Sequence, residues 1–211
     1  GMRVLDSGCG TGATLILWAE AGAKVTGLDV SAPMLAVAAR RTQGQVALVE
    51  ADAATWTGDA PFDLAVSQFG VMFFEDNDAA FANIFANIRP GGRLLFACWR
   101  SVAENAWVTT PTGAIKHLLP ATPLAPPNAQ PTTPRPGPFA LADKGRLASI
   151  LDRAGFGDVS IEPFDFDVYL ATNGGVDEAV DMLKRIGPTG AALAEADDAA
   201  RQAAPAQLNA A

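Results

Sequence analysis

The stretch of the chain with the most distinctive chemistry is VLDSGCGTG, residues 4–12, where a carboxylate stands directly before closely spaced glycines. Gly8, Gly10 and Ala13 satisfy the pattern G-x-G-x-x-G/A of loops that cradle dinucleotides. Glycines let a backbone pass close to a ligand. Asp6 is the unusual residue, because loops of this kind commonly hold phosphate. The question for function is which ligand suits glycines and a negative charge together.

The charge of Asp6 separates the possible ligands. A pyrophosphate beside it would be repelled by about 3 kcal/mol for each pair of unit charges, at roughly 5 Å and an effective dielectric constant near 20. An ammonium or sulfonium group would be attracted instead. Asp29 ends the next apolar segment and suits the two hydroxyls of an adenosine ribose. S-adenosylmethionine combines an adenosine, an ammonium and a sulfonium without any phosphate, so the pattern favours it over a dinucleotide.

The elements that must position these residues alternate between strands and helices. Apolar runs predict strands at residues 3–7, 24–29, 46–50, 62–68 and 93–99. Helices are predicted at 11–21, from a Ser31 cap to about 41, and from an Asp78 cap to 88, with a turn at 89–92. This order predicts an α/β fold, a Rossmann-like doubly wound, mostly parallel sheet with helices on both faces. Ligands of such sheets bind beyond the carboxyl ends of the strands, where the glycine turn lies.

The second half of the chain has a less regular pattern. A helix is predicted near residues 104–118, and the stretch from Pro120 to Pro138, which holds eight of the fifteen prolines, is predicted to be a surface loop. A helix at 143–154, an extended segment at 159–170 and helical sequence from Gly175 follow. We interpret residues 1–211 as one domain. Its core is 1–100, the helix and proline-rich loop at 101–140 border the substrate side, and a helix, strand and helices fill 141–211.

Composition limits the classes of function. The chain has 211 residues, of which 49% are hydrophobic and 18% charged, and its formal net charge is −8. Because nucleic acids and anionic membranes bind cationic surfaces, neither is an expected partner. No apolar run is long enough to span a bilayer, and no signal peptide precedes the first strand. Cys9 and Cys98 end different strands, so a disulfide is not expected. A cytoplasmic location is expected, because free cysteines are typical of that compartment.

Five motifs in order resemble those of class I S-adenosylmethionine-dependent methyltransferases. Residues 4–12 are similar to the first motif of this family, a hydrophobic pair, Asp, any residue and GCGTG. The other four are Gly27-Leu28-Asp29-Val30-Ser31 with Met34-Leu35, Glu50-Ala51-Asp52-Ala53, Phe62-Asp63-Leu64-Ala65 and Arg89-Pro90-Gly91-Gly92. Ser67-Gln68-Phe69-Gly70 stands where methylases of amino groups in nucleic acids and proteins carry Asn/Asp-Pro-Pro-Tyr. The resemblance therefore implies a small-molecule acceptor, as in the subgroup that includes the quinone methylases.

The resemblance also implies roles for individual residues. Asp6 and the backbone of the glycine loop would surround the methionine portion, and Asp29 would accept hydrogen bonds from the ribose. Val30 and Met34 would pack against adenine, while Asp52 and the Ala53 N–H would bond to its edge. Met34 could equally be helix core, and Cys9 is interpreted as a small residue that fits the loop. The implied cofactor-binding set is Asp6, Gly8, Cys9, Gly10, Thr11, Asp29, Val30, Met34, Asp52, Ala53, Ser67, Gln68 and Phe69.

The substrate side is less well defined. Aromatic residues either line an acceptor pocket or fill the core; they are Phe69, Phe73, Phe74, Trp99 and Trp107. Trp99, Arg100 and Asn105 are the polar candidates after the fifth strand. His117, the only histidine, is a candidate general base, and an exposed loop histidine is the alternative. No cluster has the spacing of metal ligands, so no metal is expected.

Two other functions fit the sequence less well. An NAD-dependent oxidoreductase is permitted by the glycine pattern, but Asp6 and the absence of a Tyr-x-x-x-Lys pair speak against it. A non-catalytic S-adenosylmethionine-binding protein would keep the same pocket without the reaction. Compared with the family, almost nothing precedes the first strand and no terminal strand hairpin is evident, which is the pattern of a chain truncated at its ends. The acceptor and the oligomeric state are not encoded in any recognisable motif.

Overall fold

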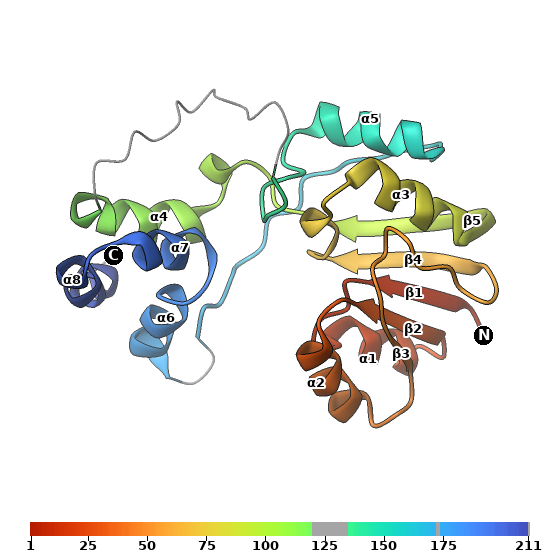
Figure 1. Cartoon of the computed structure of the whole chain (residues 1–211), viewed down its shortest axis with the longest axis horizontal. Helices are drawn as coiled ribbons and strands as arrows, with labels where there is room; N and C mark the ends of the chain where they lie inside the picture. The colour runs from red at the N-terminus through yellow and green to blue at the C-terminus, as the bar shows by residue number, and fades with distance from the viewer. Residues whose placement is uncertain (120–134, 172–173, 211) are drawn as a thin grey trace. The chain divides into compact units, whose positions relative to one another are not determined.

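The computed structural model describes residues 1–119, 135–171 and 174–210, which fall into two compact units (Figure 1). The first unit comprises Gly1–Trp99 and Arg135–Ile161, and the second comprises Arg100–Pro134 and Glu162–Ala211. Most of the predicted proline-rich loop lies outside the described residues. The interpretation of the chain as one domain stays a prediction.

The first unit is built on a five-stranded parallel sheet. Its strands are β1 (Arg3–Ser7), β2 (Lys24–Asp29), β3 (Ala47–Glu50), β4 (Phe62–Gln68) and β5 (Ile88–Ala97), in the order β3-β2-β1-β4-β5 (Figure 1). The chain adds β2 and β3 on one side of β1, and then β4 and β5 on the other side. The position between β1 and β4 is therefore the switch point of a doubly wound sheet. The predicted fold class is therefore confirmed, and three of the five strands have the predicted bounds.

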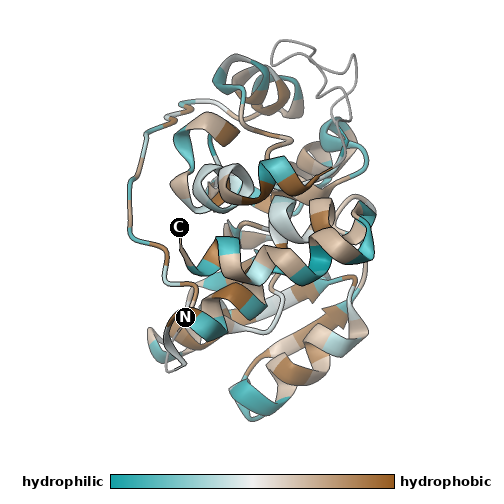
Figure 2. Ribbon diagram, turned by 90° about the vertical axis from the view of Figure 1, so that its left-hand side faces the viewer, coloured by the Kyte–Doolittle hydropathy of each residue, from teal (hydrophilic) through white to brown (hydrophobic). Residues whose placement is uncertain are grey.

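Helices cover both faces of this sheet, because successive side chains of each strand point to opposite sides. On one face, α1 (Ala13–Glu20) and α2 (Ala32–Thr42) pack Leu15 and Ala38 against Val25. On the other, α3 (Asn77–Ala86) covers Leu5 and Ala65, and α5 (Lys144–Ala154) packs beside α3. Figure 2 shows that apolar (brown) and polar (teal) residues both occur along the helices.

The predicted start and end of α3 were wrong. Asp76, not Asp78, is the N-cap, and its carboxylate accepts a hydrogen bond from the Ala79 N–H at 3.0 Å. Asp78 lies in the first turn, where it pairs with Arg153 at 2.6 Å. The helix ends at Ala86 because the chain has already entered β5 by Ile88. Two other helices begin as the sequence predicts, with Ser31 and Asp143 as their N-caps. The helix predicted at 11–21 begins later, at Ala13, because Gly12 is still in the left-handed conformation of the glycine turn.

The predicted turn at residues 89–92 is part of β5. Phe62 pairs with Ile88, but Leu64, only two residues later, pairs with Arg93. The extra residues therefore bulge out of the strand, as short glycine- and proline-containing insertions do at a sheet edge. Pro90 has no backbone N–H, and in a bulge it does not need to donate a hydrogen bond to the neighbouring strand.

The second unit is helical. It contains η2 (Val102–Glu104), α4 (Ala106–Ile115), η3 (Lys116–Leu118), α6 (Gly175–Leu183), α7 (Gly187–Glu195) and α8 (Asp198–Asn209). Its small core consists of Ile115, Val180, Leu183, Leu193, Ala204 and Leu208. Residues 162–170 form neither helix nor strand. None of the described helices combines the length and apolar character that a bilayer crossing requires.

Candidate functional site

The glycine loop after β1 has a backbone that favours glycine. Gly8, Gly10 and Gly12 have φ values of 72°, 53° and 82°, a region that side chains disfavour. The Gly8 and Cys9 N–H groups both donate to the Leu28 carbonyl, at 2.8 and 3.0 Å. These bonds hold the loop against the carboxyl ends of β1 and β2, where the fold predicts a ligand.

A second loop crosses the glycine loop at very close range. A Cβ atom on Gly8 would lie 2.8 Å from the Gly70 Cα, and one on Gly70 would lie 2.8 Å from the Ser7 carbonyl oxygen. The Ser67 hydroxyl donates to the same Ser7 carbonyl at 2.6 Å. The end of β4 is thus fastened to the end of β1 where the strand order reverses. Ser67 is buried by this contact, whereas the neighbouring Gln68 side chain is exposed.

Asp6 lies directly beneath the glycine loop and is completely buried. Thr14, in the first turn of α1, donates its hydroxyl hydrogen to Asp6 Oδ2. Among the described residues, Asp6 Oδ1 has no hydrogen-bond partner. Burial raises the Asp6 pKa from 3.8 to about 6; the Asp29 charge adds to this shift and the Thr14 hydrogen bond opposes it. At neutral pH the site therefore contains a buried, incompletely satisfied negative charge. Thr14 was missed in the sequence analysis, although its place in the first helical turn was a usable signal.

Asp29 fastens the loop from the side of β2. One of its carboxylate oxygens accepts a hydrogen bond from the Gly10 N–H at 2.8 Å, and the other accepts one from the Ser31 N–H at 2.9 Å. The residue therefore links the glycine loop to the start of α2. Arg41 holds the same loop from α2, donating to the Thr11 hydroxyl at 3.0 Å.

The pKa of the Cys9 thiol reflects the burial and the negative charges around this loop. Burial, followed by the charges of Asp6 and Asp29, raises its pKa to about 12. The Cys9 Sγ atom would lie 2.9 Å from a Cβ on Gly27, so the thiol fills a tight space against β2. This packing agrees with the interpretation of Cys9 as a small residue that fits the loop. The same two charges that disfavour a thiolate here would also disfavour a bound phosphate.

Apolar side chains border the loop on its outer side. Val30 is 69% exposed and Met34 is 48% exposed, so neither belongs to the core. Met34 Sδ lies 3.8 Å from the Cβ position of Gly10, so the side chain reaches over the loop. Beyond β3, Asp52 is exposed and its carboxylate accepts from the Ala54 N–H at 2.8 Å. The buried Ala53 is held through its carbonyl, which accepts from the Asn83 side chain at 2.8 Å.

Two of the predicted aromatic residues come together beyond β4 and β5. The rings of Phe69 and Trp99 stack with their centroids 4.5 Å apart and an angle of 13° between the planes. Phe69 has a φ of 60°, an unusual conformation for a large side chain. Phe73 is 54% exposed, whereas Phe74 packs edge-on against the buried Phe81 as ordinary core.

The other substrate-side candidates belong to the second unit. Arg100 forms an ion pair with Asp165 and lies 3.6 Å from a Glu104 carboxylate oxygen. Asn105 is buried; it donates to the Ser101 carbonyl at 2.8 Å and accepts from the Trp107 indole at 3.3 Å. These side chains therefore stabilise the local fold of this unit. His117 is exposed in η3.

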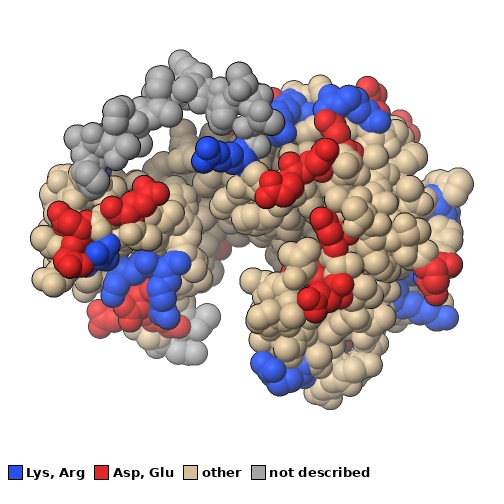
Figure 3. Space-filling view, viewed as in Figure 1, with Lys and Arg blue, Asp and Glu red and all other residues tan. Residues whose placement is uncertain are grey.

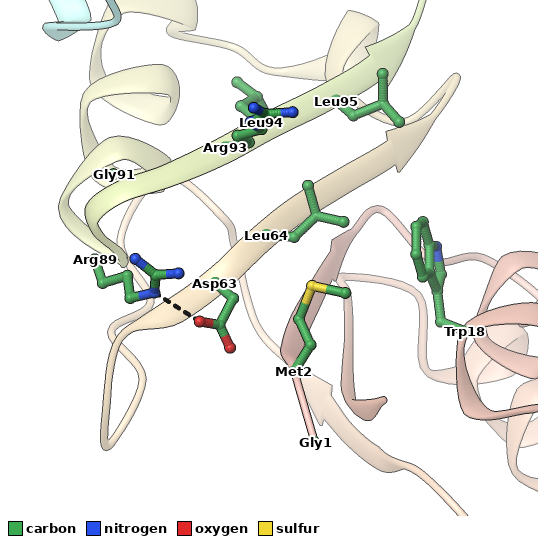
Figure 4. A pocket seen from close by; sticks show the side chains of 10 residues that line it. All are labelled: Gly1, Met2, Trp18, Asp63, Leu64, Arg89, Gly91, Arg93, Leu94 and Leu95. Atoms are coloured by element: carbon green, nitrogen blue, oxygen red, sulfur yellow. Dashed lines mark hydrogen bonds and ion pairs between the residues drawn. The ribbon is translucent and has the colours of Figure 1, made fainter. Parts of the chain in front are cut away.

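One hollow in the surface lies away from the glycine loop. A cavity of about 790 Å³ lies at the amino ends of β4 and β5, lined by Met2, Trp18, Leu64 and Leu95 beside the Asp63–Arg89 ion pair (Figure 4). Basic side chains on the face in Figure 3 occur in small groups interspersed with acidic ones. Across the described residues, no group of three or more His, Cys, Asp or Glu side chains is placed to hold a metal.

The strand order, with the glycine loop at the switch point and carboxylates at the ends of β1 and β2, is that of a doubly wound α/β domain. Residues 4–92 match the family described as "Methyltransferase domain", in agreement with the resemblance of the sequence motifs.

Curated relatives agree with this assignment. A malonyl-[acyl-carrier protein] O-methyltransferase of Enterobacter lignolyticus is 42% identical over 116 residues, covering 49% of this chain and 46% of the relative. The same enzyme of Pseudescherichia vulneris is 40% identical over 93 residues, or 44% of this chain and 37% of the relative. A demethylmenaquinone methyltransferase of Thermus thermophilus is 37% identical over 99 residues, or 44% of this chain and 45% of the relative. The chain spans less than half the length of each of these relatives.

Proposed function

We propose that this chain binds S-adenosylmethionine and transfers its methyl group in line to a small-molecule acceptor. The observation that carries the proposal is the glycine loop held between two carboxylates. One of them, Asp6, is buried with an unpartnered oxygen, and both raise the pKa of the intervening Cys9 thiol. A loop in this electrostatic setting favours a cationic ligand over a phosphorylated one.

The residues around the loop fit this molecule. A buried carboxylate oxygen without a partner is costly, so a nearby ammonium group would stabilise it. Asp6 and the loop backbone would hold the methionine portion, and Asp29, Val30 and Met34 the nucleoside. Asp52 and the Ala53 N–H would recognise adenine. When bound, the molecule supplies a methyl group activated by a positively charged sulfur.

Methyl transfer depends more on the correct placement of the acceptor than on removal of a proton from it, because the positively charged sulfur is already a good leaving group. Gln68 and the stacked Phe69–Trp99 pair, with the exposed Phe73, are proposed to guide the acceptor. Arg100, Asn105 and Trp107 stay candidates, and so does His117 as a base for acceptors that must lose a proton. The names of the relatives include an acyl-carrier-linked malonyl group and a quinone, which supports a small organic acceptor.

The decisive binding test compares S-adenosylhomocysteine with NADH by calorimetry, for the wild type and for Asp6→Asn. We expect the wild type to bind S-adenosylhomocysteine and to reject NADH, and Asp6→Asn to lose at least about tenfold in affinity for the former. Asp152→Asn, an exposed carboxylate on α5, is the matched control and should change neither affinity. Tight NADH binding by the wild type would overturn the proposal.

Methyl transfer is tested separately with labelled S-adenosylmethionine and a panel of carboxylates, phenols, quinones and amines. Transfer to at least one acceptor, lost in Asp6→Asn, is expected. Cofactor binding without transfer to any member would indicate a binding protein instead. A cytoplasmic location is also proposed; it is supported by the two free cysteines, which follow the non-adjacent strands β1 and β5.

A further inference from the structure

The hydrogen bond made by the Thr14 hydroxyl differs from those of two other hydroxyls on helices of the first unit. Thr42 on α2 and Ser149 on α5 each donate to the carbonyl four residues earlier in their own helix, at 2.9 Å. Such a bond satisfies the hydroxyl locally. Thr14, the second residue of α1, donates instead to Oδ2 of Asp6 on β1. Its hydrogen bond therefore joins the helix to the carboxylate under the glycine loop.

The start of α1 does not depend on this hydroxyl. The N-cap of the helix is Gly12, whose backbone is in the left-handed conformation. No side-chain hydrogen bond caps the first turn. Loss of the Thr14 hydroxyl would therefore remove a partner of Asp6, and it would leave the residues that begin the helix unchanged.

Asp6 depends on this donor because its other surroundings disfavour a charge. The residue is completely buried, and within the described part of the chain its Oδ1 atom has no hydrogen-bond partner. The charged group that acts on it, Asp29 at the end of β2, is negative, and the nearby Cys9 thiol has a pKa raised to about 12. Burial and Asp29 both raise the Asp6 pKa, whereas the Thr14 hydrogen bond lowers it. Of these three influences, only Thr14 favours the charged carboxylate.

We propose that Thr14 is a positioning residue for ligand recognition: its hydroxyl holds the Asp6 carboxylate in the negatively charged form, and this charge attracts the cationic amino-acid portion of the ligand. A hydrogen bond to a charged acceptor is stronger than one to a neutral acceptor, so a single hydroxyl can stabilise the charge. Because it takes S-adenosylmethionine as the ligand, the proposal rests on the proposed function. It adds that the amino-acid portion and the nucleoside are recognised by separable groups.

The test measures the affinity for S-adenosylhomocysteine by calorimetry from pH 5 to pH 8. Valine has nearly the shape of threonine but no hydrogen to donate. In Thr14→Val we expect the rise in affinity with pH to shift upward by about one pH unit. The loss relative to the wild type should be about fivefold at pH 6 and less than about twofold at pH 8, where the carboxyl is ionised in both proteins. Thr14→Ser keeps the donor and should follow the wild type.

A second ligand separates the charge effect from a general loss of binding. 5′-Methylthioadenosine contains the nucleoside and a neutral thioether, without the amino-acid portion. Its affinity should change neither with pH nor with Thr14→Val. Thr42→Val is the matched control, because it removes a buried hydroxyl whose hydrogen bond stays within α2. It should leave both affinities and the pH profile unchanged.

The charge on Asp6 can also be followed without any ligand. Titration of its carboxyl carbon by nuclear magnetic resonance should give a higher midpoint in Thr14→Val than in the wild type. Thr14→Ala removes the donor without placing a methyl group where the hydroxyl was, and it should shift the midpoint in the same direction. An unchanged midpoint in both variants would overturn the proposal.

The binding data distinguish two kinds of failure. A wild type that binds S-adenosylhomocysteine, with a Thr14→Val variant that loses the same factor at every pH, would show that Thr14 only supports the fold. An equal loss of 5′-methylthioadenosine affinity in Thr14→Val would show the same. Either result overturns the role of Thr14 and leaves the proposed function standing. A wild type that binds no S-adenosylhomocysteine at any pH would overturn both.

Discussion

Asp6 is the residue at which stability and function conflict. Its carboxyl has a pKa raised from 3.8 to about 6, mainly by burial, so the folded chain holds this proton more tightly than the unfolded chain does. A raised carboxyl pKa means that stability falls as pH rises through the interval between the two values. A shift of about two units corresponds to about 3 kcal/mol lost above pH 6.

The first prediction follows from this linkage. The ligand-free wild type should lose about 3 kcal/mol of unfolding free energy from this residue between pH 4 and pH 7, whereas Asp6→Asn should lack that decline. Urea denaturation at several pH values measures both. Asp152→Asn is again the control and should follow the wild type. A parallel decline in Asp6→Asn and the wild type would show that Asp6 does not titrate in this interval.

The second prediction concerns ligand affinity. If an ammonium group binds near ionised Asp6, the affinity for S-adenosylhomocysteine should rise about tenfold from pH 5 to pH 7, because only the ionised form attracts the cation. Calorimetry in buffers of different ionisation enthalpy would detect the proton released on binding below pH 6. An affinity independent of pH in this range would contradict a contact with Asp6.

At the scale of single elements, apolar runs predicted the strands because parallel strands are buried on both faces. The sequence could not show which of several similar local signals determines where a helix begins or a strand continues. The sequence analysis chose Asp78 as the cap, although Asp76 is an aspartate too and is the actual N-cap. The pairing of Asp78 with Arg153, far along the chain, belongs to the folded structure. The bulge at residues 89–92 resembles a turn in sequence because both use proline and glycine.

The candidate site shows the same division. The glycines, Asp6 and Asp29 could be found because their types and spacing are local. The contacts of Thr14 with Asp6 and of Ser67 with Ser7, and the crossing of Gly70 over Gly8, join separate elements. The place of Thr14 in the first helical turn was a usable local signal, but no local pattern predicts the other two contacts.

The crossing of the two loops gives the third prediction. Gly8→Ala would combine a strained φ of 72° with a Cβ atom 2.8 Å from Gly70, whereas Gly22→Ala has a similar φ of 82° and open space around it. Gly22→Ala should cost about 1–2 kcal/mol from backbone strain alone. Gly8→Ala should cost at least about 1 kcal/mol more and weaken S-adenosylhomocysteine binding. Equal losses in urea denaturation would mean that the close approach has no energetic weight.

At the scale of the whole molecule, the described residues of each unit form their own apolar clusters. The core of the sheet belongs to the first unit, and the cluster around Ile115 belongs to the second. Composition and periodicity gave no sign of this division, because each half contains ordinary amphipathic helices. The boundary is visible only once long-range packing is known.

The fourth prediction uses this division. Ile115 is completely buried, so Ile115→Ala should destabilise the helices of the second unit by about 3 kcal/mol. Hydrogen exchange should accelerate in α4, α6 and α8 and stay unchanged in β1 and β4. Leu15→Ala, in the core beside β2, should show the opposite distribution. Uniform acceleration in both variants would show that the two units unfold together.

The packing of Cys9 has a practical consequence for labelling the protein. Burial raises the pKa of Cys98 as well as that of Cys9, so the thiolate is less populated at both positions than at an exposed cysteine. Maleimide dyes react with thiolates, and both native positions should therefore react more slowly than an exposed cysteine in the folded chain. A single cysteine introduced on the surface could then carry a fluorophore without removal of either native one.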